Sequence, residues 1–141
     1  MWPSTPEDRL HQWYQLRVDT EQGDLELALM TINNWWFRVP IQARYLDWDQ
    51  PDKWPDPWQL LNDNVYCDIA QSLGIMYTIM LLQRFDISDL CMVRGQEDNL
   101  VLVNEGKYIL NWAPGQLLNI SSSKIHIKQS ISSKLFDHYT R

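Results

Sequence analysis

Tryptophan is the feature of this chain that most constrains its fold. Eight of the 141 residues are Trp, and five of these fall between residues 35 and 58. Indole rings at this density require either an unusually aromatic core or a surface that a partner covers. The sequence alone leaves these two interpretations equally open.

The composition around these residues divides the chain into parts. We expect a single domain over residues 1–141, with a helical part at 1–39, a Trp- and Pro-rich connector at 40–56, a core at 57–120 and a basic tail at 121–141. Hydrophobic residues make up 45% and charged residues 21%, which is typical of a globular protein with one hydrophobic core.

The formal charge of −6 is unevenly distributed. Residues 1–118 contain 8 Lys and Arg against 17 Asp and Glu, a net charge of −9, whereas residues 119–141 contain 4 against 1, a net charge of +3. An acidic body argues against nucleic acid as a partner, because phosphate binding needs clustered Lys and Arg. No stretch approaches the roughly 20 apolar residues of a membrane span. Met1–Pro6 also lacks the basic and apolar regions of a secretory signal, so we expect no membrane partner.

Helix caps organise the first half of the chain. Thr5, Asp24 and Asp56 each precede a run with helical spacing, and each can accept a hydrogen bond from the first turn of a helix. These patterns predict two N-terminal helices and a central helix over residues 57–73, which Gly74 would end.

The second half of the chain reads mostly as strand. The apolar run Ile75–Arg84 predicts a strand, with a helix as the competing interpretation. Runs at 99–104 and 107–112 flank Glu105-Gly106 and predict a β-hairpin. The remaining expected elements are a short strand, a helical turn and an edge strand, at 90–94, 116–119 and 124–128. The expected fold class is therefore α+β, with N-terminal helices and a central helix packed on a small antiparallel β-sheet.

The side chains that usually carry chemistry are sparse. The three histidines, His11, His126 and His138, lie far apart, and the chain has no metal-binding spacing and no glycine-rich phosphate loop. We therefore expect neither a metal nor a cofactor. Cys67 is the main enzymatic candidate, but Asp68 beside it disfavours a thiolate. In the third turn of the predicted central helix, Cys67 would gain little from the helix dipole, so we expect it to be buried and inert.

A capped helix, the stretch Ser72–Ile75, a hairpin and the stretch Tyr108–Trp112 follow one another over residues 54–113. This order resembles the core of the transglutaminase-like and papain-like cysteine hydrolases. In that family a Cys opens the helix, a His stands on the next strand, and an Asp or Asn on the strand after it orients the His. This chain has Asn99 where the family has His, and Asn111 alone matches. The resemblance implies the fold without its chemistry.

One enzymatic alternative stays open beside that interpretation. In it, Cys67 acts as the nucleophile of a cysteine hydrolase or amidase with Asn111, and His126 or His138 arrives from the tail.

A second resemblance concerns three stretches, Trp54–Trp58, Tyr66–Ala70 with Ser72–Gly74, and Leu100–Val103 followed by Lys107–Asn111. They look similar to small proteins of T4-like tailed phages of cyanobacteria. This resemblance implies a virion part or an assembly factor, located in the virion or in the host cytoplasm.

The expected function is that of a non-enzymatic structural or assembly protein that binds other protein subunits. Its predicted contact residues are Tyr45, Trp48 and Trp54 in the connector and Lys124 and Lys128 in the tail, because aromatic and basic side chains often anchor interfaces. If the connector is a contact surface, at least one of its two indoles, Trp48 or Trp54, should be partly exposed in the isolated protein.

Overall fold

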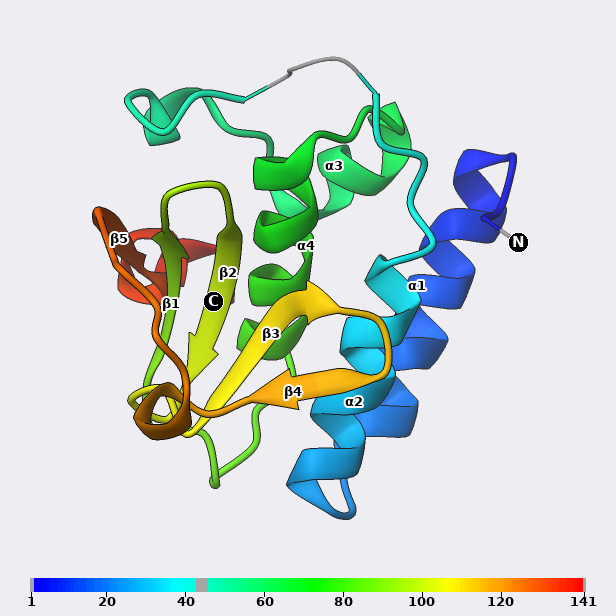
Figure 1. Cartoon of the computed structure of the whole chain (residues 1–141). Helices are drawn as coiled ribbons and strands as arrows, with labels where there is room; N and C mark the ends of the chain where they lie inside the picture. Colours follow the sequence, from blue (N-terminus) through cyan, green and yellow to red (C-terminus); the bar gives the residue numbers. More distant parts are fainter. Residues whose placement is uncertain (1, 43–45, 141) are drawn as a thin grey trace.

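The computed structural model describes residues 2–42 and 46–140. Its elements form an α+β fold (Figure 1). The α-helices are α1 (Pro6–Thr20), α2 (Leu25–Trp36), α3 (Pro57–Asp63) and α4 (Asp68–Met80). The strands are β1 (Leu90–Arg94), β2 (Asn99–Val103), β3 (Tyr108–Ala113), β4 (Gln116–Leu118) and β5 (Gln129–Ser132). Three 3-10 helices complete the list, η1 (Pro51–Lys53), η2 (Ile120–Ser122) and η3 (Ser133–Thr140).

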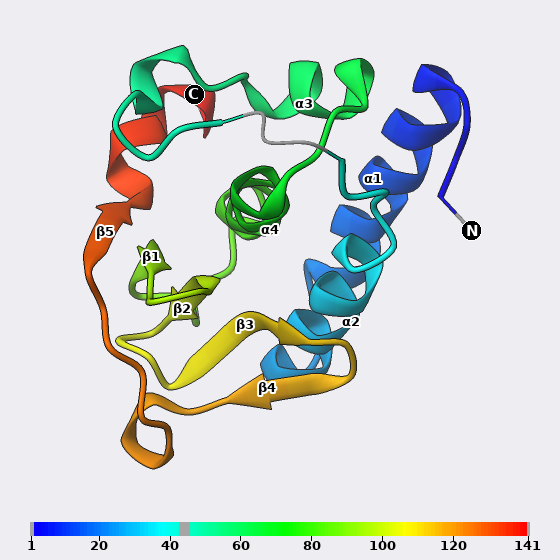
Figure 2. The same cartoon turned by 45° about the horizontal axis from the view of Figure 1, so that its top comes forward.

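Helix α4 lies at the centre of the molecule, as the view nearly along its axis shows (Figure 2). Every residue from Ile69 to Ile79 is buried. The antiparallel sheet, in the order β4-β3-β2-β1-β5, packs against one side of α4, and α2 and α3 contact its other sides. The core therefore surrounds one helix on all sides.

The three expected helix caps are confirmed. Thr5 Oγ1 accepts a hydrogen bond from the Asp8 N–H, and Asp24 and Asp56 accept equivalent bonds in α2 and α3. Each side chain satisfies one N–H of a helix start that has no partner within the helix. The sequence therefore located these helix starts correctly.

The predicted single helix over residues 57–73 is wrong. Asn64 has a left-handed backbone (φ 58°) that ends α3, and the chain is extended at Cys67 before α4 begins. Asn and Asp at 62–64 favour such a break because they are weak helix formers and Asn tolerates this conformation. The predicted cap at Gly74 is also wrong, since this residue lies in the middle of α4 beneath the Trp36 ring.

The predicted strand Ile75–Arg84 is wrong for a related reason. A helix buried on all sides shows no apolar stripe, so its sequence reads as an unbroken apolar run. The strand at 90–94 and the hairpin are confirmed, although its turn spans 104–107 rather than two residues. Residues 116–118 form β4 instead of a helical turn. The edge strand lies at 129–132 rather than at 124–128.

The segment that contains β5 and η3 packs against the sheet edge, the connector and α4. Strand β5 pairs with the outer edge of β1, and η3 follows it. Phe136 on η3 is buried, stacks on the Trp54 ring and meets the Tyr77 ring edge-on. Helix η3 is thus packed onto the connector and α4.

Candidate functional site

The two connector indoles belong to the core. Trp48 and Trp54 are 5% and 6% exposed, so the expectation of a partly exposed indole is wrong. Trp48 Nε1 donates to Asn99 Oδ1 at 2.7 Å, and Trp54 Nε1 donates to the Asp47 carbonyl oxygen at 2.9 Å. Both rings are therefore buried within the chain, and both indole N–H groups have a hydrogen-bond acceptor there. Tyr45, the third predicted contact residue of the connector, lies outside the described residues.

The two predicted contact residues of the tail are exposed. Lys124 and Lys128 lie in the irregular segment between η2 and β5. Lys124 also lines a hollow of about 420 Å³ together with Trp112 and His126. These lysines remain accessible to a partner, and neither Trp48 nor Trp54 lines the hollow that Lys124 borders.

Cys67 occupies a different place from the one its sequence context predicted. It is the residue that precedes the first turn of α4, it is 6% exposed, and its side chain makes no capping hydrogen bond. A hollow of about 390 Å³ lies beside it, between the connector, the start of α4 and the β1–β2 loop. Its walls include Trp48, Asp68 and Asn99, and none of the described residues that line it is a histidine.

The two tail histidines of the enzymatic alternative lie elsewhere. His126 lines the neighbouring hollow on the other side of the β1–β2 loop, where its carbonyl oxygen faces Gly95. His138 lies on η3, with its ring centroid 4.0 Å from that of Tyr139. The structure therefore brings Cys67 and Asn99 to one hollow, and it places neither imidazole on the walls described there.

Asn111 holds elements together. Its backbone is left-handed (φ 71°) at an irregularity of the β3–β4 pairing. Its Nδ2 donates to Ser72 Oγ at 2.9 Å and to the Asn99 carbonyl oxygen at 2.8 Å. Its backbone N–H donates to Asn33 Oδ1 at 2.8 Å. These bonds link α2, α4, β2 and β3. The Asn111 Oδ1 atom is buried and has no hydrogen-bond partner among the described residues.

The surface that the sequence did not reveal lies on α1 and α3. Trp13 is buried, and two side chains contact its ring. The guanidinium carbon of Arg17 lies 4.2 Å from the centroid of the Trp13 ring. The ring of Trp58 meets the Trp13 ring edge-on, with the centroids 6.0 Å apart. Tyr14 is 55% exposed and Trp58 is 44% exposed. We call the exposed residues Tyr14, Val18 and Trp58, together with the half-buried Arg17, the α1–α3 surface.

Arg17 is the unusual member of this surface. Its Nε atom is buried and has no hydrogen-bond partner among the described residues. Burial lowers the pKa of its guanidinium, and the nearby Tyr14 opposes that shift only in part. The guanidinium is therefore held half-buried against the Trp13 ring, with one donor unsatisfied among the described residues. The i, i+4 spacing of Trp13 and Arg17 could have suggested the stacking, but not the exposure of Trp58 on another helix.

Other kinds of site find no support among the described residues. No group of three or more His, Cys, Asp or Glu side chains there could hold a metal ion. No helix in that part of the chain has both the length and the apolar character needed to cross a membrane. In the comparisons with known proteins, no family model, no curated protein and no solved structure matches this chain.

Proposed function

We propose that this protein is a non-enzymatic structural or assembly protein that acts through contacts with other proteins, as a component of a phage particle. The observation that carries the proposal is the α1–α3 surface, where Arg17 stacks on Trp13 near the exposed Tyr14, and the exposed Trp58 meets the same Trp13 ring edge-on. The phage setting rests on the sequence resemblance described above.

The composition of this surface is that of an interface anchor. Trp, Tyr and Arg are the residue types whose truncation costs most at protein interfaces. The stacking fixes the Arg17 guanidinium before binding, so less side-chain freedom is lost when a partner docks.

Phage particles and their assembly intermediates, purified on gradients, provide the test. We expect the wild-type chain to be present in one of these fractions. Trp58→Ala should lower its amount at least about tenfold, and Arg17→Ala should act in the same direction. Leu135→Ala, which shortens an exposed apolar side chain on η3, is the matched control and should leave the amount unchanged. A wild-type chain absent from every fraction would contradict the proposal.

The alternative, a cysteine hydrolase that uses Cys67, has one observation in its favour. The thiol precedes the first turn of a core helix and borders a hollow, which is where a nucleophilic cysteine is usually placed. A hydrolase also needs a base within hydrogen-bond reach of the sulfur, and neither His126 nor His138 lines that hollow in the described structure. We therefore propose the contact function ahead of it.

A further inference from the structure

Phe85 is the most exposed large apolar side chain of the described structure. Its relative exposure is 107%, more than in an extended reference chain. It lies in the loop that joins α4 to β1, at the lower edge of the molecule in Figure 1. We call residues 83–89 the Phe85 loop. A single exposed apolar residue is ordinary on a protein surface, so the question is whether the loop that presents it is fixed.

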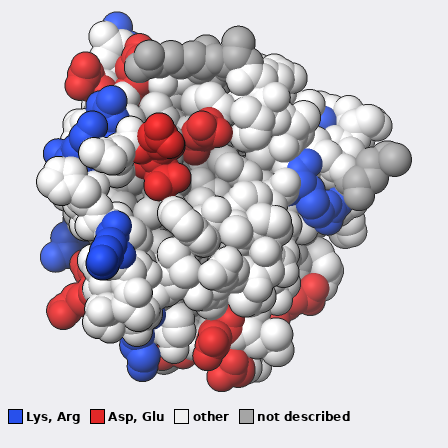
Figure 3. All heavy atoms as spheres, in the orientation of Figure 1, with Lys and Arg blue, Asp and Glu red and all other residues white. Residues whose placement is uncertain are grey.

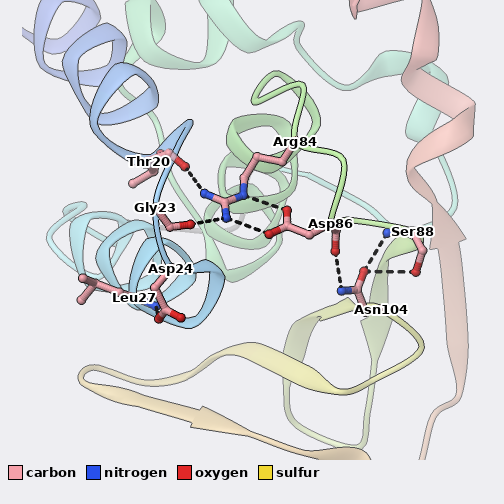
Figure 4. A network of polar contacts seen from close by, with 8 residues as sticks. All are labelled: Thr20, Gly23, Asp24, Leu27, Arg84, Asp86, Ser88 and Asn104. Carbon is pink, nitrogen blue, oxygen red and sulfur yellow. Dashed lines mark hydrogen bonds and ion pairs between the residues drawn. The ribbon is translucent and has the colours of Figure 1, made fainter.

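The residues on either side of Phe85 are held by hydrogen bonds (Figure 4). Arg84 Nε and Nη2 donate to the two carboxylate oxygens of Asp86, at 2.9 and 2.8 Å. The same guanidinium donates to the carbonyl oxygens of Thr20 and Gly23 at the α1–α2 turn, at 2.9 and 2.7 Å. The Arg84 side chain is only 6% exposed. The guanidinium of Arg84 therefore holds both neighbours of Phe85, Arg84 itself and Asp86, against the α1–α2 turn.

Asn104 holds the loop from the other side. Its Nδ2 donates to the Asp86 carbonyl oxygen at 2.9 Å, and its Oδ1 accepts from the Ser88 N–H at 2.8 Å. The loop is thus tied to the α1–α2 turn and to the β2–β3 hairpin at once (Figure 4). An exposed aromatic side chain on a fixed loop loses little conformational freedom when it is buried by a partner, which favours binding.

The charges around the Phe85 loop are mostly negative. The hydrogen bonds to Asp86 raise the pKa of Arg84, and Asp24 adds to this shift through space. Asp89 accepts a hydrogen bond from the Glu105 N–H. Figure 3 shows acidic side chains along the lower edge of the molecule, with basic side chains at the left of that edge, and the Phe85 loop lies at the lower edge in Figure 1. Among the cations on the neighbouring segments, Arg84 is paired with Asp86, and Lys107 at the end of the β2–β3 turn lies 5.6 Å from the Tyr108 ring centroid. Lys134 lines a hollow that Asp89 and Asp137 also line.

We propose that Phe85 is an anchor that inserts into an apolar pocket of another protein, and that Lys or Arg side chains rim this pocket. The apolar pocket follows from the fully exposed ring on a fixed loop, and the basic rim follows from the carboxylates of Asp24, Asp89 and Glu105 around it. These carboxylates disfavour insertion into a membrane, because the surface of anionic lipid repels them. The site is a second surface beside the α1–α3 surface and does not depend on it.

Photo-crosslinking in the cells that naturally make the protein identifies the partner. The photoreactive analogue p-benzoylphenylalanine replaces Phe85 in one variant and Leu135 in a control variant, which is also exposed and apolar. We expect one protein adduct that is specific to position 85. Its crosslinked residue should line an apolar pocket that has Lys or Arg at its rim. The absence of an adduct, an adduct on phospholipid, or an adduct at a flat or acidic surface would overturn the proposal.

Binding of the two purified proteins then tests the energetics. Phe85→Ala should weaken the complex about 30-fold or more, whereas Leu135→Ala should not change it. Asp89→Asn with Glu105→Gln should slow association several-fold and reduce its dependence on salt. Circular dichroism confirms that each variant is folded. Equal affinity of the wild type and Phe85→Ala would overturn the proposal. So would sedimentation of the protein with vesicles of phosphatidylcholine and phosphatidylglycerol that depends on Phe85.

Discussion

Gly74 lies on the side of α4 that faces α2, beneath the six-membered ring of Trp36. A Cβ atom at this position would lie 2.6 Å from Trp36 Cζ2. Trp36 is fully buried, and its Nε1 donates to Thr78 Oγ1 at 2.9 Å, so the ring cannot easily move aside. The close approach of the two helices therefore depends on the missing side chain.

Gly74→Ala should consequently destabilise the protein. Overpacking of this kind costs about 1–3 kcal/mol, and the better helix propensity of Ala returns about 1 kcal/mol. We expect a net loss of about 1 kcal/mol in urea unfolding. Gly95→Ala is the control, because its Cβ would stand 3.4 Å from the His126 carbonyl oxygen, an ordinary contact. A Gly74→Ala protein as stable as the wild type would show that Trp36 can shift.

Cys67 should react slowly with iodoacetamide at neutral pH. It is 6% exposed, and the described residues around its hollow supply no imidazole to take its proton. The same protein in denaturant, where the thiol is accessible, is the control. Mass spectrometry of the labelled peptide separates Cys67 from Cys91. Native labelling of Cys67 faster than that of a free thiol would support the hydrolase alternative and contradict the contact function.

At the scale of elements, the break between α3 and α4 determines where Cys67 and the central helix lie. Asn64 ends α3 in a left-handed conformation, and the Gln42 N–H donates to the Tyr66 carbonyl oxygen at 2.8 Å in the extended stretch that follows. The Asp56 carboxylate fixes the other end of α3 by accepting from the Gln59 N–H at 2.7 Å. A short helix with few turns depends strongly on such caps.

Asp56→Ala should therefore cost about 1 kcal/mol of stability, because the Gln59 N–H loses its partner. Denaturant unfolding measures the difference. Asp49→Ala, an exposed carboxylate of the same connector, should be close to neutral. Equal stability of Asp56→Ala and the wild type would mean that water replaces the cap at no cost.

The elements that could be predicted are those encoded by neighbouring residues. Thr5, Asp24 and Asp56 cap helices that begin beside them, and the hairpin follows from alternation around Gly106. Helix α4 could not be predicted from its pattern, because burial on all sides removes the periodicity on which such a prediction depends.

The candidate site was the least predictable part, since distant residues decide which aromatics are exposed. Trp48 is covered through Asn99 and Trp54 through Phe136, whereas Trp58 and Phe85 remain exposed. The residues next to a Trp or Phe in the sequence do not indicate whether a distant residue covers its ring. Cys67 shows the same limit, because its place before α4 follows from the break at Asn64 rather than from its neighbours' chemistry.

At the scale of the whole molecule, the Arg84 network connects the helical part to the sheet. Its bonds reach Thr20 and Gly23 on one side, and through Asp86 they reach Asn104 in the β2–β3 hairpin (Figure 4). Hydrogen bonds from Arg84 hold the pKa of the Asp86 carboxyl below its ordinary value. The ionised form of Asp86 is therefore favoured in the folded protein.

Because the pKa of Asp86 is lower in the folded protein than in the unfolded chain, ionised Asp86 stabilises the fold above the unfolded pKa. Asp86→Asn should be less stable than the wild type at pH 7. The difference should shrink as the pH falls below about 4, the range in which an unfolded Asp takes up a proton, and it should vanish below the folded pKa. Urea unfolding at several pH values measures it, with Asp49→Asn as the control. A difference that stays constant with pH would mean that shape, rather than charge, accounts for the effect.

The position of Phe136 has a consequence for how the protein is made. The ribosome delivers the connector long before η3, because Trp54 precedes the whole sheet in the chain and Phe136 follows it. Until η3 emerges, the face of the Trp54 ring that Phe136 covers stays open to water or to a chaperone. Synthesis therefore passes through a stage in which the sheet can already pair while the Trp54 ring is still uncovered, and the emergence of η3 ends that stage.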